Sequence, residues 1–184
     1  MPFSSIGLVG VFRKVMEHRV TSHLPSETIR RGLYMETQPF KTGYLPEQDG
    51  HRIFFEECGR PNGKPCVILH GGPGAHLDYL LPHLLDLADE FELLFYDQRG
   101  GGRSRTDDPA PITWQVHVGD LALAAAELVP GPVHLLGYSW GALLALLYAV
   151  ESAGGRVTPT PASLTLIDPA PVSQIFRDAF EAEF

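Results

Sequence analysis

The stretch that decides the fold of this chain is LLGYSWGALLALLYAV, residues 135–150. Its apolar start ends at Gly137, and an apolar run of helical length follows Gly141. Ser139 lies between the two glycines, so the stretch indicates a strand, a sharp turn and a helix. A serine at such a turn adopts a strained backbone, and glycines two positions on either side let strand and helix approach each other. The pattern predicts that Ser139 is a nucleophile presented at a strand end.

The start of the predicted helix adds an electrostatic argument. The first backbone N–H groups of a helix have no helical partner, and together with the helix dipole they favour developing negative charge. The N–H of Trp140 is therefore expected to be one donor of an oxyanion hole. The plain alternative is a glycine-rich turn that contains a serine by chance.

A second glycine-rich loop, HGGPG at residues 70–74, follows a predicted apolar strand that begins at Cys66. Its glycines allow the backbone to curl so that an N–H points inward, which is what a second oxyanion donor requires. Gly72–Pro73 is a candidate cis bond. Alone the loop is compatible with an ordinary tight turn; together with the turn at Ser139 it indicates a catalytic edge.

A third loop, DQRGGGRS at residues 97–104, follows a strand that begins near Glu92. Its glycines and arginines suggest a phosphate cradle, but the loop matches neither of the common glycine-rich phosphate-binding patterns. Asp97 and Arg99 are therefore expected to hold the loop structurally.

The whole pattern predicts an α/β fold. TGYLPE and HRIFFEEC indicate two strands joined at Asp49-Gly50, a dipeptide that favours hairpin turns. Strands and helices then alternate, with helices predicted over residues 79–91, 113–129 and 140–151, the second capped by Thr113, and with a last strand before Asp168. A β hairpin followed by β-α-β units means a mostly parallel sheet with helices on both faces, and chemistry at the carboxyl ends of its strands.

The chain is expected to have three parts. Residues 1–34 carry scattered charges without a sustained period and are predicted to be a weakly ordered extension. Residues 35–170 form the main α/β segment, and Met35, just ahead of its first strand, is a candidate translation start. Residues 171–184 form a third, C-terminal segment.

Composition excludes several classes of function. A net charge of −8 and the lack of a basic run argue against a nucleic-acid partner. The apolar patch at residues 6–12 has its basic residues on the wrong side for a secretory signal, and no apolar run is long enough to cross a membrane. Cys58 and Cys66 fit neither a disulfide framework nor a zinc site, so both are expected to be reduced, as in the cytoplasm. No metal or cofactor is expected, and nothing indicates an oligomeric state.

Together, HGGPG, DQRGGGRS and GYSWGA resemble the proline iminopeptidase branch of the α/β-hydrolase fold, as does the run GYLPEQDGHRIFFEECGRPNGKPCVILHGGPG. The resemblance extends from about Thr42 to about Asp168. It implies a serine hydrolase that removes an N-terminal residue, typically proline, from short peptides through an acyl-enzyme. It also implies that residues 171–184 are the start of the helical cap that covers the site in this family. Carried over by position, Ser139 would be the nucleophile, and Gly72 and Trp140 would give the oxyanion N–H groups. Ala142 departs from a usual glycine, Gly101 from a common cysteine, and LIDPAP from the usual sequence after the sixth strand.

The groups that would activate Ser139 are missing where this fold places them. A serine nucleophile needs a histidine base and an orienting carboxylate, which in this fold follow it in the chain. All eight histidines precede Ser139. His70 is expected to be a structural hydrogen-bonding residue, and His134 starts the strand that ends near Ser139, roughly 16 Å away. Asp168 is a candidate acid, with turn formation or helix capping as the alternative.

We therefore expect an incomplete fragment of a serine hydrolase, truncated after about the sixth strand and inactive alone. Its substrate would be a small peptide, or another amide or ester. One alternative is a relative on the same fold that acts on esters, lactones or other amides. The other is a hydrolase-like domain that binds without catalysis.

Overall fold

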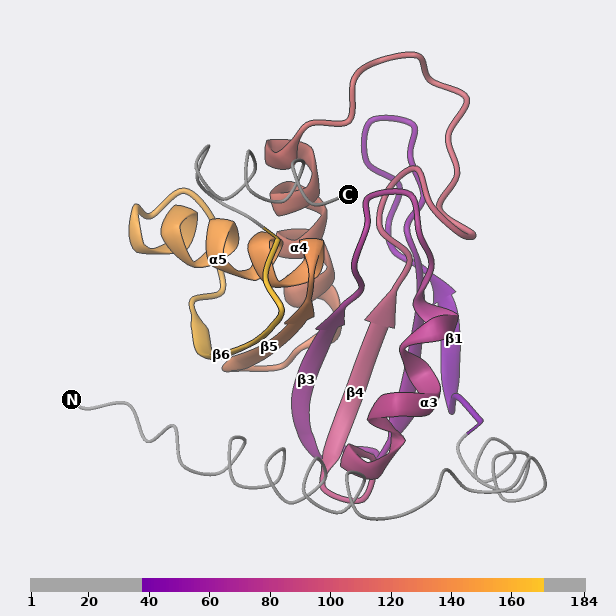
Figure 1. Cartoon of the computed structure of the whole chain (residues 1–184), viewed down its shortest axis with the longest axis vertical. Helices are drawn as coiled ribbons and strands as arrows, with labels where there is room; N and C mark the ends of the chain where they lie inside the picture. The colour runs from indigo at the N-terminus through magenta and orange to yellow at the C-terminus, as the bar shows by residue number, and fades with distance from the viewer. Residues whose placement is uncertain (1–37, 171–184) are drawn as a thin grey trace, which may run out of the picture.

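The computed structural model describes residues 38–170, so the expectations for residues 1–34, for Met35 and for residues 171–184 lie outside the described residues. Within the described part, six strands form one sheet in the order β1-β2-β4-β3-β5-β6, with helices packed on it (Figure 1). The strands are β1 Lys41–Tyr44, β2 Phe54–Gly59, β3 Lys64–Leu69, β4 Phe91–Tyr96, β5 Val133–Tyr138 and β6 Pro161–Ile167. The two long helices are α4 Trp114–Leu128 and α5 Trp140–Ala153. The predicted α/β fold is confirmed.

The N-terminal hairpin forms where the sequence predicts it. β1 and β2 pair antiparallel, and Gln48 bridges His51 across the turn. Asp49 and Gly50 have φ values of 52° and 75°, the two positive values that a tight hairpin turn needs at its centre. On its other side β2 pairs with β4, to which it is also antiparallel.

The other four strands run parallel, because a helical segment separates each from the next. Their carboxyl ends therefore meet at one edge of the sheet, and the loops at residues 70–74, 97–104 and 137–141 leave from that edge. Among the described residues, β6 pairs with β5 alone and is an edge strand of the sheet.

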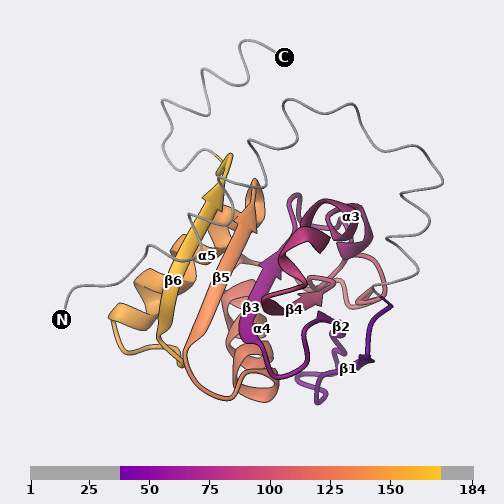
Figure 2. The ribbon, with the colours of Figure 1, turned by 90° about the horizontal axis from the view of Figure 1, so that it is seen from below.

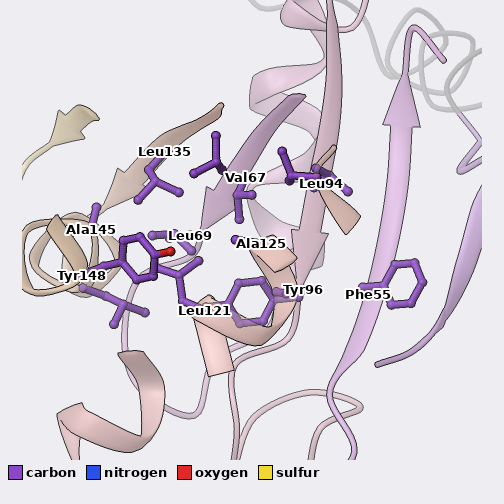
Figure 3. Close-up of a cluster of buried hydrophobic side chains, with 14 of the residues drawn as sticks. Phe55, Val67, Leu69, Leu94, Tyr96, Leu121, Ala125, Leu135, Ala145 and Tyr148 are labelled. Atoms are coloured by element: carbon purple, nitrogen blue, oxygen red, sulfur yellow. The ribbon is translucent and has the colours of Figure 1, made fainter. Parts of the chain in front are cut away.

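Both faces of the sheet are covered by apolar contacts, as the near-continuous apolar strands require. Successive side chains on a strand point to opposite faces, so Val67 and Leu69 of β3 pack with α4 and α5, whereas Cys66 and Ile68 pack with the short helices on the other side (Figures 2 and 3). The helix α4 contributes Val118, Leu121 and Ala125 to the cluster that contains Val67 and Leu69. Thr113 takes the N-cap position of α4, but its side chain makes no capping hydrogen bond.

The predicted helix over residues 79–91 is wrong in its extent. Three short pieces replace it, η1 Leu77–Tyr79, α3 Leu81–Leu84 and η2 Leu85–Leu87. Backbone hydrogen bonds between residues three apart close the first and last pieces, from Leu80 N–H to the Leu77 carbonyl and from Ala88 N–H to the Leu85 carbonyl. A 3₁₀ turn aligns residues three apart, so several leucines reach the sheet from one side. Burial of these leucines outweighs the regular helical period.

Cys58 and Cys66 are free thiols and fully buried. Burial raises the pKa of each to about 12, because the low-dielectric interior disfavours a thiolate. Both act as small apolar core residues, in agreement with the predicted reduced state.

No helix among residues 38–170 has the length and apolar character needed to cross a bilayer.

Candidate functional site

Ser139 sits in the sharp turn between β5 and α5. Its backbone has φ 53° and ψ −117°, a conformation that L-residues rarely adopt and that costs on the order of 1–3 kcal/mol. The turn is held from outside, because Ser139 N–H donates to the Ile167 carbonyl at 2.9 Å and Ala170 N–H donates to the Ser139 carbonyl at 3.1 Å. The side chain of Ser139 makes no hydrogen bond to any residue of the described chain. The predicted strand, turn and helix are thus present, with a half-buried serine at the turn.

The two flanking glycines are required by close backbone approach. A side chain at Gly137 would collide with the carbonyl of Gly141, and one at Gly141 would collide with the carbonyl of Leu69 on β3. The turn therefore presses against the end of the neighbouring strand. These contacts fix residues 137–141 in a tight turn, which we call the elbow.

The HGGPG loop lies directly beside the elbow. A methyl group at Gly71 would lie 3.0 Å from Ser139 Cβ, so nothing separates the loop from the serine. Gly72 and Gly74 have φ values of 58° and 87°, and Ala75 N–H closes the turn on the Gly72 carbonyl at 3.0 Å. The Gly72–Pro73 bond is trans, because the cis bond of the described residues is Thr158–Pro159; that prediction was wrong.

Backbone N–H groups beside Ser139 differ in their hydrogen bonding. Gly71 N–H donates to the Tyr79 hydroxyl at 2.6 Å and is committed. Within residues 38–170, the N–H groups of Gly72 and Trp140 donate to no protein acceptor. One of these two amides belongs to the loop that contacts the serine through Gly71, and the other is at the start of α5.

His70 is a buried structural residue, as predicted from its place in the loop. Its Nδ1 lies 2.9 Å from the Gly71 carbonyl, and Gln98 N–H donates to its Nε2 at 3.0 Å. Nε2 must be unprotonated to accept, so Nδ1 carries the proton and the ring is neutral. Burial lowers the pKa of His70, which agrees with that neutral form.

Gln98 joins the three loops, a role that the sequence did not reveal. Its side-chain amide donates to the His70 carbonyl at 2.7 Å, and its Oε1 accepts the indole N–H of Trp140 at 2.8 Å. Trp140 also stacks edge-to-face on His117, with ring centroids 5.6 Å apart. The residue after Ser139 is therefore anchored to the 97–104 loop and to α4.

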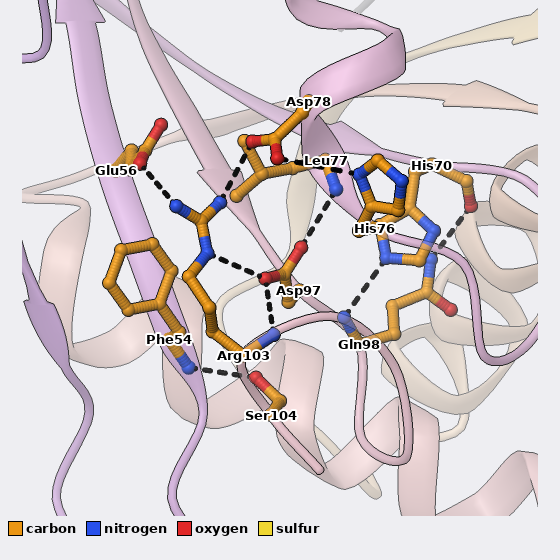
Figure 4. Close-up of polar contacts among 10 residues, drawn as sticks. All are labelled: Phe54, Glu56, His70, His76, Leu77, Asp78, Asp97, Gln98, Arg103 and Ser104. Carbon is orange, nitrogen blue, oxygen red and sulfur yellow. Dashed lines mark hydrogen bonds and ion pairs between the residues drawn. The ribbon is translucent and has the colours of Figure 1, made fainter.

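The 97–104 loop is held by charged side chains around a buried carboxylate (Figure 4). Asp97 is fully buried and accepts from Leu77 N–H at 2.7 Å and from the backbone and guanidinium of Arg103 at 2.8 and 3.0 Å. The same guanidinium reaches Glu56 and Asp78, each at 2.9 Å. Burial raises the pKa of Glu56, against the lowering effect of Arg103.

Arg99 forms a separate buried ion pair with Asp120 of α4, through two hydrogen bonds of 3.0 and 2.6 Å. Asp97 and Arg99 are thus both engaged inside the protein, and their predicted structural roles agree with these contacts. At Gly101 a side chain would collide with the Ala75 carbonyl, so this loop and HGGPG are closely packed.

Two further candidate residues, Asp168 and His134, make no hydrogen bond to the Ser139 side chain. Asp168 follows β6 at the same sheet edge as Ser139, is exposed, and has an unusual φ of 42°. Its side chain forms no hydrogen bond or ion pair with a described residue. His134 Nδ1 lies 2.7 Å from the Ser163 hydroxyl, at the opposite end of β5 from the elbow. Over residues 38–170, no histidine is hydrogen-bonded to Ser139 and no cluster of side chains has the composition of a metal site.

The chain is similar to several proline iminopeptidases. It is 40% identical over 121 residues to that of Xylella fastidiosa (strain 9a5c), covering 65% of this chain and 38% of the relative. It is 36% identical over 164 residues to a probable proline iminopeptidase of Streptomyces coelicolor, covering 81% and 50%. The chain thus spans half or less of the length of these curated relatives.

Solved structures show the same likeness. A proline iminopeptidase-related protein of Thermus thermophilus superposes with a TM-score of 0.60 at 30% identity, over 70% of this chain and 44% of that one. The proline iminopeptidase of Mycobacterium smegmatis gives a TM-score of 0.55 at 30% identity, over 62% and 41%. The family model described as "Alpha/beta hydrolase family" matches residues 66–183. With six strands in the observed order and a serine elbow after β5, the chain belongs to the alpha/beta hydrolase family.

Proposed function

We propose that this chain carries the nucleophile and the oxyanion donors of a serine hydrolase of the proline iminopeptidase type. The observation that carries the proposal is the strained backbone of Ser139, combined with unpaired amides in the adjoining loop, at Gly72, and at the start of α5, at Trp140. The similarity to proline iminopeptidases supports the substrate class, an N-terminal prolyl residue of a short peptide. A cytoplasmic location stays a prediction.

The proposed reaction uses the arrangement as follows. Ser139 Oγ attacks the carbonyl carbon of the N-terminal residue, and its proton passes to a base and then to the leaving amine. The carbonyl oxygen becomes an oxyanion that accepts from Gly72 and Trp140 N–H, at the positive end of α5. Water then hydrolyses the acyl-enzyme. The neutral, buried His70 is committed to Gly71 and Gln98, so it does not serve as this base.

The base is therefore proposed to come from a residue other than those described. Asp168 stays a candidate acid, because it lies at the carboxyl end of β6 beside the elbow. The 184-residue chain alone is expected to hydrolyse proline p-nitroanilide at the background rate, and ordinary turnover would contradict this part of the proposal.

Added imidazole tests whether Ser139 is the nucleophile and which substrate it attacks, because a small base can enter an open site and accept the serine proton. Release of p-nitroaniline from proline p-nitroanilide should rise with imidazole in the native chain and stay at the solution rate in Ser139→Ala. A stimulated, Ser139-dependent rate with p-nitrophenyl acetate alone would indicate an esterase instead. If neither substrate shows a difference between the two proteins while proline peptides still bind, the chain is a binding module.

A further inference from the structure

The hydroxyl of Tyr79 borders the same glycine, Gly71, as the side chain of Ser139, although no sequence motif includes it. A methyl group at Gly71 would lie 3.0 Å from Tyr79 Oη and also 3.0 Å from Ser139 Cβ. Because both atoms are 3.0 Å from one point, they are at most about 6 Å apart. That span is short enough for one small ligand group to touch both.

The hydrogen-bonding state of this hydroxyl leaves its proton available. Tyr79 Oη accepts Gly71 N–H at 2.6 Å, so one of its lone pairs is occupied. Within residues 38–170 its own O–H finds no acceptor. Burial raises the pKa of Tyr79, so the group is a neutral phenol that can donate. An O–H whose oxygen already accepts a bond is the stronger donor for it.

The ring that carries this hydroxyl is both held in place and reachable. It packs edge-to-face on Tyr138, with centroids 6.5 Å apart, and on His76, with centroids 6.2 Å apart. Tyr79 is nevertheless 37% exposed, so a ligand at the elbow can reach it. Two aromatic contacts and one backbone bond thus hold the hydroxyl beside the serine.

We propose that the Tyr79 hydroxyl is a third hydrogen-bond donor at the Ser139 site, contacting an oxygen of the tetrahedral group formed on Ser139. This inference rests on the proposed function. It also explains why two neighbouring amides of HGGPG differ among the described residues: Gly71 N–H binds and positions the phenol, whereas Gly72 N–H has no acceptor.

Phenylboronic acid gives a direct test, because it needs no leaving group. The Ser139 hydroxyl adds to boron, an oxygen–boron bond forms, and the serine proton goes to solvent, so that a tetrahedral boronate anion results. Boron-11 NMR measures the dissociation constant of this adduct. Since a hydrogen bond to an anion contributes about 1.5–3 kcal/mol, Tyr79→Phe should weaken binding by at least about tenfold. The matched control Tyr44→Phe removes a hydroxyl from an exposed ring on β1, at the far side of the sheet from β5, and should bind within about twofold of the native chain.

A second variant separates donation from a merely structural role. 3-Fluorotyrosine at position 79 makes the phenol a stronger donor and a weaker acceptor for Gly71 N–H. Measured below the pKa of the fluorinated phenol, boronate binding should tighten. Weaker boronate binding by the 3-fluorotyrosine variant would overturn this inference but not the proposed function. Equal binding by Tyr79→Phe and the native chain would do the same. If the native chain forms no adduct, or Ser139→Ala forms as much, the proposed function fails as well.

Discussion

The elbow at residues 137–141 and the loop at residues 97–104 leave the same edge of the sheet but are held in opposite ways. The elbow contains no charged side chain, and its shape comes from two glycines packed against backbone and from the Ser139 N–H bond to Ile167. The other loop depends on a buried carboxylate and the guanidinium of Arg103. The difference teaches that a nucleophile turn can be built without occupying the side chain of its nucleophile. In the charged loop, in contrast, the side chains of Asp97 and Arg103 are occupied by hydrogen bonds to each other.

The largest expected effect breaks the charged loop. Asp97→Ala leaves Arg103 without its buried partner and Leu77 N–H without an acceptor, so the free energy of unfolding should fall by about 3–5 kcal/mol. Urea unfolding measures the change. The control Asp107→Ala, at an exposed residue of the same region, should change stability by less than about 0.5 kcal/mol. A loss at Asp97 no greater than at Asp107 would show that the loop does not depend on charge.

A smaller effect is expected from the elbow. Gly141→Ala forces a methyl group against the Leu69 carbonyl, so strand and helix must separate, at a cost of about 1–3 kcal/mol. The control is Gly119→Ala in α4, where a methyl group meets nothing within 4 Å and should stabilise the helix by about 0.5–1 kcal/mol. Opposite signs in thermal unfolding support the packing argument, and equal effects contradict it.

The smallest effect concerns His70, which links the two loops through Gln98. Its pKa is lowered on folding, because burial disfavours the charged ring, so the unfolded chain binds its proton more readily. Its contribution to stability is fully present above the ordinary pKa of 6.5 and is lost as the pH falls below it. His117 and His134 shift the same way, so His70→Gln should reduce this pH dependence without removing it. An unchanged pH profile in His70→Gln, with the His70 ring titrating near 6.5 by NMR, would contradict the neutral buried form.

Much of the fold and part of the site follow from local sequence. The hairpin at Asp49-Gly50, the apolar strands and the turn at Ser139 each depend on a few adjacent residues, and each is where the sequence predicts it. The helix over residues 79–91 was predicted wrongly, because packing of leucines on the sheet determines its broken form. The assignment of Gly72 and Trp140 as oxyanion donors stays a proposal that their unpaired amides support.

By itself the sequence determined the order of strands and helices, the sheet edge where three loops meet, and the serine that one of them carries. Those features depend on side-chain period, glycine and turn chemistry, which act over a few residues. Only the tertiary structure decided which polar groups are free and which are committed. It pairs Gly71 with Tyr79, joins Gln98 to His70 and Trp140, and places Asp97 against Arg103. Such pairings join separate segments of the chain, and a buried donor or acceptor takes its partner from whichever segment the fold brings within hydrogen-bond distance.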